Sequence, residues 1–206
     1  MVRKLMNSII IIGASGHGSV IADMAKDLGY SVFFWDDDIT KKISGYDVYK
    51  RELNNSINSR LIIGIGSNNT REAISFQYQQ ESFISLIHPK AIISNKTKIA
   101  TGTVVLAGAI VNCGTTIEEH CILNTGAVVD HDCVLGKYVH ISPNATLCGN
   151  VIIGSGTWIG AGATVIQGIK IGENVTVGAG TVIINDIPNN VTVVGNPGRI
   201  IKVNKK

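Results

Sequence analysis

The strongest constraint on the fold is a repeat of six residues that runs from Ile93 to Ile183. Counted in sixes from Ile93, the first position of all sixteen hexads is aliphatic, without a slip. These residues are Ile93, Ile99, Val105, Val111, Ile117, Leu123, Val129, Leu135, Ile141, Leu147, Ile153, Ile159, Val165, Ile171, Val177 and Ile183. The fifth position is small or branched, and the position after the aliphatic residue is often Gly, Asn, Asp or Ser, which are residue types that turn a chain.

A period of six matches neither the 3.6-residue period of a helix nor the two-residue period of a half-buried strand. It predicts a short strand, a corner and another short strand, which is the pattern of a parallel β-helix. Three hexads make one triangular coil of about 18 residues, with the aliphatic side chains pointing inward. Each coil bonds only to its neighbours, so the expected product is a stiff prism with a stacked aliphatic core.

The chain before the repeat has the pattern of a small α/β domain, which we place at residues 1–88, with the prism at 89–206. The apolar segments Ser8–Ile12, Val32–Trp35 and Leu61–Ile65 predict strands, and Phe83–Leu86 predicts a last short one. Helices are expected from about Val20 to Leu28 and near 71–79. This is the βαβ order of a small Rossmann-like domain. The repeat ends at Asp186-Ile-Pro188, after which a closing segment is expected.

A glycine-rich turn, Gly13-Ala-Ser-Gly16-His-Gly18, follows the first predicted strand. Open α/β sheets bind ligands at this edge, and glycines there let backbone N–H groups approach a phosphate at a helix N-terminus. Asp36 and Asp37, after the second strand, lie where a ribose or sugar hydroxyl would be held. The alternative is a tight strand-to-helix turn without a ligand. NAD is less favoured because the domain is too short for both halves of a dinucleotide fold.

Composition limits the partners and the compartment. A net charge of +3 with 16% charged residues argues against nucleic acid as the main partner. The four cysteines all lie in the repeat without a CxxC pair, and the fifth-position Cys121 and Cys133 are interpreted as small core residues in a reducing compartment. No apolar run approaches the roughly 20 residues that cross a bilayer, and no signal peptide is recognisable. We therefore expect a cytoplasmic protein that does not insert into membranes.

Polar residues that break the aliphatic pattern are the candidates for chemistry, and His131 is the first of them. It lies at a predicted corner, and the residue one coil above it is Gly149, which leaves a gap over the imidazole. A neutral imidazole, with an ordinary pKa of about 6.5, can accept a proton near pH 7. A carboxylate beside it would raise its basicity and fix its tautomer, a role open to Asp132 and to Asp130.

Several motifs together resemble one family. They are the GASGHG turn, the aspartate pair, Gly64-Ile-Gly66-Ser-Asn-Asn69 followed by Arg71, and His88-Pro89 before the repeat. This order resembles bacterial hexapeptide-repeat acetyltransferases that act on UDP-4-amino-sugars such as UDP-N-acetylbacillosamine precursors, and relatives that O-acetylate sialic acid. The resemblance implies a left-handed β-helix, acetyl-CoA as cosubstrate without a metal, a role in glycan biosynthesis, and a homotrimer with active sites between subunits.

The resemblance also implies roles for individual residues. His131 would be the general base and Asp132, where many relatives have Glu, would increase its basicity. The UDP-sugar contacts would be Ser15, Gly16, His17, Asp36, Asp37, Gly66 and Asn124. The acetyl-CoA contacts would be His140, Gly149, Ala161 and Ala179. Two alternatives stay open: Asn124 could form a corner ladder with Asn112, and His140 could merely stack on Trp158, one coil above.

The favoured function is acetyl transfer to the amino group of a UDP-4-amino-sugar. A close alternative transfers acetyl to a sugar hydroxyl, as in sialic acid. A distant alternative is a zinc hydratase of the β-helix carbonic anhydrase type, in which His120, His131 and His140 would hold the metal. The last is a scaffold or sugar sensor without catalysis, against which the His131-Asp132 pair argues.

Overall fold

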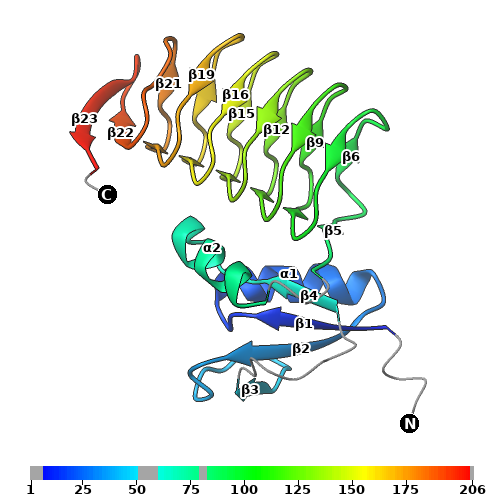
Figure 1. Ribbon diagram of the computed structural model, residues 1–206. Coiled ribbons are helices and arrows are strands. Elements are labelled where there is room, and N and C mark those ends of the chain that lie inside the picture. Colours follow the sequence, from blue (N-terminus) through cyan, green and yellow to red (C-terminus); the bar gives the residue numbers. More distant parts are fainter. Residues whose placement is uncertain (1–6, 51–59, 79–82, 205–206) are drawn as a thin grey trace. The chain divides into compact units, whose positions relative to one another are not determined.

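The computed structural model describes residues 7–50, 60–78 and 83–204. The chain forms two compact units, one up to Leu86 and one from Ile87 onward, and each is described by itself (Figure 1). The first is a small α/β domain and the second is a parallel β-helix, as the sequence predicts.

A parallel four-stranded sheet forms the centre of the N-terminal domain, in the order β3-β2-β1-β4. Its strands are β1 (Ser8–Ile12), β2 (Ser31–Asp36), β3 (Val48–Lys50) and β4 (Arg60–Ile63). All five residues of β1 are buried, because this strand lies between β2 and β4. A strand at β3 was not expected from the sequence.

Two helices accompany the sheet, and both begin earlier than the sequence pattern suggested. Helix α1 (Gly16–Asp27) starts at the glycine turn, where Ser15 caps it, and α2 (Asn68–Gln77) is capped by Ser67. Gln79, the expected end of the second helix, lies outside the described residues. Phe83 forms only an isolated bridge to Leu61, and the strand at this point is β5 (Leu86–Ile87), which joins a sheet of the prism.

Each of the sixteen hexads forms one two-residue strand whose second residue is the aliphatic one. The strands are β6 (Ile92–Ile93), β7 (Lys98–Ile99), β8 (Val104–Val105), β9 (Ile110–Val111), β10 (Thr116–Ile117), β11 (Ile122–Leu123), β12 (Val128–Val129), β13 (Val134–Leu135), β14 (His140–Ile141), β15 (Thr146–Leu147), β16 (Ile152–Ile153), β17 (Trp158–Ile159), β18 (Thr164–Val165), β19 (Lys170–Ile171), β20 (Thr176–Val177) and β21 (Val182–Ile183). Each strand from β6 to β18 pairs in parallel with the strand 18 residues further on, as in Val128 with Thr146.

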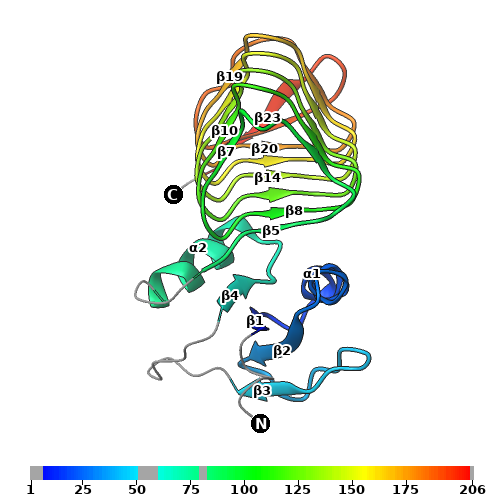
Figure 2. The same ribbon diagram turned by 90° about the vertical axis from the view of Figure 1, so that its right-hand side faces the viewer.

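These pairings build three sheets, which form the three sides of the prism seen along its axis in Figure 2. The eight-stranded sheet contains β8, β11, β14 and β17, the six-stranded sheet contains β9, β12 and β15, and the five-stranded sheet contains β10, β13 and β16. After the last hexad, β22 (Val191–Val194) and the antiparallel β23 (Arg199–Val203) end the eight-stranded sheet.

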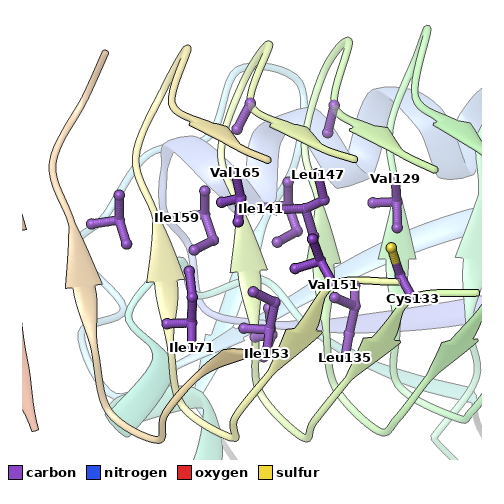
Figure 3. Packing of buried hydrophobic residues seen from close by; sticks show 14 of the residues in the cluster. Val129, Cys133, Leu135, Ile141, Leu147, Val151, Ile153, Ile159, Val165 and Ile171 are labelled. Carbon is purple, nitrogen blue, oxygen red and sulfur yellow. The ribbon is translucent and has the colours of Figure 1, made fainter. Parts of the chain in front are cut away.

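The interior of the prism is a stack of aliphatic side chains (Figure 3). Val129, Leu135, Ile141 and Leu147, one from each successive strand, are fully buried. The fifth position of the hexad also points inward, so Cys133 is buried as the small core residue that the sequence predicts. The core therefore fixes which residue of each hexad faces outward.

The fourth position of the hexad makes the turn, not the second position suggested by residue types. From 102 to 180 every fourth-position residue has a φ between +53° and +75°. Eight are glycines, and the others are His120, Asp132, Tyr138, Asn144, Asn150 and Asn174. Asparagine and aspartate tolerate this left-handed conformation better than most residues. Asp132 thus occupies one of the turn positions of the coil.

Within the described part of the chain, no helix is long and apolar enough to span a lipid bilayer.

Candidate active site

The glycine turn after β1 is held by contacts within the domain. The hydroxyl of Ser15 donates a hydrogen bond to the Gly64 carbonyl (2.6 Å) and accepts one from the Gly18 backbone N–H (3.2 Å). Gly13 has a φ of +112°, and a β-carbon on Gly18 would collide with the Gly13 carbonyl. Ser15, Gly13 and Gly18 therefore shape the turn, whatever else they bind.

Gly16 and Gly66 are different, because nothing in the fold requires a glycine at either place. Neither has a positive φ, and a β-carbon at either position would meet no atom within 4 Å. Gly16 is the first residue of α1, where backbone N–H groups lack partners within the helix. The open space at both residues is consistent with a ligand that approaches the backbone closely.

The carboxylate of Asp36 already has hydrogen-bond and ion-pair partners inside the domain. Its carboxylate accepts hydrogen bonds from the backbone N–H of Ala14 (2.8 Å) and Asp38 (2.9 Å), and the Lys41 ammonium contacts both oxygens (2.9 and 3.0 Å). Burial alone would raise the pKa of Asp36, but the hydrogen bonds from Asp38, Lys41 and Ala14 outweigh it and lower the pKa. Asp37, the other predicted substrate contact, is exposed.

Lys41 and Arg71 were not among the predicted site residues, although both shape this edge of the domain. The Arg71 guanidinium is buried and donates to the carbonyls of Ile65 (3.2 Å) and Gly66 (3.1 Å) and to the Asn68 side chain (2.8 Å). Its charge also acts on His17, whose pKa is lowered to about 4, first by burial and then by Arg71. His17 is therefore a neutral imidazole at physiological pH.

The His131-Asp132 pair lies at the corner between the six-stranded and five-stranded sheets. The Nδ1 atom of His131 is 2.8 Å from Oδ2 of Asp132, and the two side chains are 48% and 58% exposed. The hydrogen bond to Asp132 is the main reason why the pKa of His131 is raised above its ordinary value. An exposed imidazole oriented by a carboxylate can accept a proton through Nε2.

Asp130 supports the backbone of the pair and does not contact the ring. Its Oδ1 accepts hydrogen bonds from the His131 backbone N–H (2.8 Å) and from the Asn112 side chain (2.7 Å). The sequence left open whether Asp130 or Asp132 orients the imidazole. The structure shows that it is Asp132.

Gly149 lies one coil above His131, as predicted. The space left by its missing side chain is not empty, however, because the His131 imidazole fills it. A β-carbon on Gly149 would lie 2.5 Å from His131 Nε2 and 2.6 Å from Cε1. Any side chain at this position would displace the ring.

Asn124 and His140 belong to a second cluster, on the eight-stranded sheet. The Asn124 amide nitrogen is 3.1 Å from His140 Nε2, and because this NH₂ group can only donate, Nε2 is the acceptor. The His140 ring stacks on Trp158 (5.3 Å between centroids, 9° between planes). Trp158 in turn donates from Nε1 to the Ser142 hydroxyl (2.6 Å). His140 thus stacks on Trp158, as the sequence alternative allowed, and also contacts Asn124, which the sequence did not predict.

Not all of the predicted site residues of the prism meet within one chain. His131, Asp132 and Gly149 lie at the corner that separates the six-stranded from the five-stranded sheet, whereas the Asn124-His140 cluster belongs to the eight-stranded sheet. Ala161 and Ala179 follow β17 and β20, at the corner between the eight-stranded and six-stranded sheets.

The three histidines of the hydratase alternative are also separated. His120 lies in the turn before β11 and stacks on Tyr138 (5.5 Å), while His131 and His140 lie in the two places already described. Among residues 7–50, 60–78 and 83–204, no group of three or more His, Cys, Asp or Glu side chains is arranged to hold a metal ion.

Comparison with known proteins shows to which family the chain belongs. Residues 8–78 match the PglD N-terminal domain, and residues 114–149 and 150–185 each match the bacterial transferase hexapeptide (six repeats). The acetyltransferase domain of PglB from Neisseria gonorrhoeae FA1090 is 39% identical, with a TM-score of 0.91 over 95% of this chain and 100% of that one. The chain belongs to the hexapeptide-repeat sugar N-acetyltransferases.

Other members of this family have been solved with ligands. Perosamine N-acetyltransferase from Caulobacter crescentus, a His-to-Asn variant in complex with CoA and GDP-perosamine, is 34% identical, with a TM-score of 0.92 over 96% of this chain and 98% of that one. The PglB domain has also been solved with acetyl coenzyme A. UDP-N-acetylbacillosamine N-acetyltransferase from Bacillus subtilis (strain 168) is 40% identical over 113 residues. That match spans 50% of this chain and 52% of the relative, about half the length of each.

Exchange of Asp132 for Asn tests the electrostatics of the pair. Because the carboxylate stabilises the imidazolium, Asp132→Asn lowers the pKa of His131 toward its ordinary value. The pKa is measured by NMR titration of the imidazole C–H resonances. Asp130→Asn is the matched control and lowers the pKa less, since Asp130 acts on the ring only through its charge. An equal shift in both variants would contradict the assignment.

Proposed function

We propose that the protein transfers the acetyl group of acetyl-CoA to the amino group of a UDP-linked 4-amino-sugar, for the synthesis of a bacterial glycan. The observation that carries this proposal is the exposed His131-Asp132 pair, whose imidazole has a raised pKa and lies against Gly149. Relatives that act on nucleotide-linked amino-sugars support the choice of acceptor.

The reaction needs one base and no covalent enzyme intermediate. The sugar amine, in its neutral form, attacks the thioester carbonyl while Nε2 of His131 takes the proton that the nitrogen loses. The tetrahedral intermediate then breaks its C–S bond, and the CoA thiolate receives the proton from the imidazolium. Binding both reactants side by side supplies the proximity that the direct transfer requires.

In the N-terminal domain, the nucleotide-sugar would lie along the open side of the glycine turn. The space at Gly16 and Gly66 supports this placement, together with the exposed Asp37. Ser15 and Asp36 would act mainly by shaping the turn, since their polar atoms already bind Gly64, Ala14 and Lys41. The neutral His17 can exchange a hydrogen bond with the ligand without adding charge.

We also infer a homotrimer with each active site between two subunits. The base at one corner and the Asn124-His140 cluster on the eight-stranded sheet are separated within one chain, so a single chain does not form a complete site. A neighbouring copy would bring its eight-stranded sheet to the corner of the first.

The free thiols of all four cysteines fit a reducing compartment such as the cytoplasm.

An acetyl-transfer assay tests the function. Acetyl-CoA is incubated with UDP- and GDP-linked 4-amino-sugars and with free sialic acid, and thiol release is measured together with product mass. We expect turnover with a UDP-linked amine and a loss of about 10²–10⁴-fold in kcat for His131→Ala, with acetyl-CoA binding retained. Acetylation of sialic acid alone would favour the hydroxyl acceptor, and unchanged turnover of His131→Ala would leave only a binding role.

Mixing two inactive variants tests the shared site. His131→Ala and His140→Ala chains are unfolded and refolded together. The acetyl-transfer activity of the mixture is then measured, and light scattering gives the mass of the oligomer. If each site takes its base from one subunit and its His140 from the next, random trimers regain about a quarter of the wild-type activity. Trimers that regain none would show that both residues act in the same subunit.

Substitution of Gly16 tests the nucleotide-sugar site. Gly16→Ala meets no atom of the protein, so Tm stays the same or rises slightly. A methyl group pressed against a ligand costs roughly 1–3 kcal/mol, which weakens binding about 5- to 150-fold. Gly18→Ala is the contrasting control and lowers Tm, because its β-carbon collides with the Gly13 carbonyl. Unchanged UDP-sugar binding by Gly16→Ala, measured by calorimetry, would remove the ligand from this turn.

A further inference from the structure

We propose that Gly114 is a positioning residue for the His131-Asp132 pair, because its missing side chain makes room for the Asp132 carboxylate. The importance of this role for acetyl transfer rests on the function proposed above. The geometric role itself does not, because it can be measured on the free protein.

Gly114 lies one coil below Asp132, and the two residues are in contact. Both have the left-handed turn conformation, with φ values of +75° and +59°. The backbone N–H of Asp132 donates to the Cys113 carbonyl (2.9 Å), which fixes the register of the two turns. A β-carbon on Gly114 would overlap Oδ1 of Asp132 and lie 3.2 Å from its Cγ.

The two oxygens of this carboxylate therefore have different surroundings. Oδ1 lies over Gly114, and Oδ2 faces Nδ1 of His131 at 2.8 Å. If a side chain occupied the space over Gly114, the carboxylate would have to rotate or rise, and the bond from Oδ2 to the ring would lengthen or break. The pair is thus bounded on both sides by glycines, Gly114 under the carboxylate and Gly149 against the imidazole.

The same arrangement recurs at turns where no histidine adjoins the turn residue. A β-carbon on Gly126 would meet Oδ1 of Asn144, and one on Gly156 would lie 2.5 Å from Oδ1 of Asn174. A glycine one coil below a turn asparagine therefore recurs in this prism. At Gly114 the residue above is an aspartate with a histidine beside it, so the same arrangement here positions a carboxylate that can act on an imidazole.

The contact with the residue one coil above distinguishes Gly114 from another glycine of the same column. Gly168 lies two coils above Asp132 in the same column and has nearly the same φ (+74°), yet a β-carbon there would meet nothing within 4 Å. Asn150 shows that this column accepts asparagine at a φ of +59°. Gly114→Asn would therefore suit the backbone while filling the space under the Asp132 carboxylate.

The test compares Gly114→Asn with Gly156→Asn. Both place an asparagine at a turn position with a similar φ, +75° and +70°, and both crowd the turn residue one coil above. Only the first crowds a partner of His131. We expect NMR titration to show a lower pKa of His131 in Gly114→Asn, in the direction of Asp132→Asn, and no change in Gly156→Asn.

Kinetics give a second readout that a purely structural role would not change. In Gly114→Asn the acidic limb of the kcat/KM profile moves to lower pH, and the plateau falls by up to about 10²-fold. Adding Gly114→Asn to Asp132→Asn should shift the His131 pKa no further, because the carboxylate through which Gly114 acts is already gone. Gly156→Asn keeps the wild-type profile.

Three results would overturn the proposal. They are a folded Gly114→Asn with the wild-type pKa of His131, an equal pKa shift in Gly156→Asn, and a Gly114 that tolerates neither Asn nor Ala while Gly156 tolerates both. The last would make Gly114 a requirement of the fold and not of the pair. A wild-type protein without acetyl transfer would refute the proposed function instead, and would leave the pKa comparison valid.

Discussion

The register of one coil on the next, 18 residues further along the chain, decides where every side chain of the prism lies. The backbone hydrogen bonds that hold this register join residues 17 apart, as from Val128 N–H to the Ala145 carbonyl (2.9 Å) and from Asp130 N–H to the Leu147 carbonyl (3.0 Å), and they pair Val128 with Thr146. A slip by one residue would turn the aliphatic side chains outward, so burial of the core holds the register. A residue's neighbours above and below are therefore fixed by the sequence.

The polar candidates for catalysis lie at outward positions of this rigid prism, and the corner at His131 shows that the fold can accommodate them without losing a turn residue. The fourth position of the hexad needs a residue that tolerates a positive φ, which glycine and asparagine provide along most of the prism. Aspartate tolerates the same conformation and adds a charge. Asp132 can thus serve as the turn residue and as the partner of the imidazole at once. The exposed position also spares the carboxylate most of the cost of desolvation.

The sequence predicted the prism well because its signal is collective, whereas the smaller domain depends on local detail. Sixteen aliphatic residues in phase leave one arrangement that buries them all. The edge strand Val48–Lys50 has only three residues and no such phase, so it was missed. The starts of both helices were placed too late because apolar spacing marks the buried face of a helix, while Ser15 and Ser67 mark its first turn.

The candidate site was predictable where residues adjoin in sequence or lie one coil apart. His131 and Asp132 are neighbours, and Gly149 follows at the coil interval. The choice between Asp130 and Asp132 depended on side-chain rotamers, which no pattern encodes. Likewise, the contact between the Lys41 ammonium and the Asp36 carboxylate depends on the path of a loop. Residue type and position predicted Asp36 as a ligand contact, but not that its oxygens already bind Ala14 and Lys41.

Three histidines illustrate how the surroundings of a residue decide its chemistry. Burial and the charge of Arg71 keep His17 neutral, and the Asn124 amide makes Nε2 of His140 an acceptor. His131 alone is exposed and has a raised pKa. A raised pKa makes the neutral imidazole a stronger base but also lowers the fraction that is neutral at a given pH. The amine acceptor of the proposed reaction must be deprotonated too, so both reacting groups become competent in the same direction, as pH rises. An amine acceptor therefore tolerates the strengthened base, because the pH that deprotonates the amine also deprotonates the imidazole.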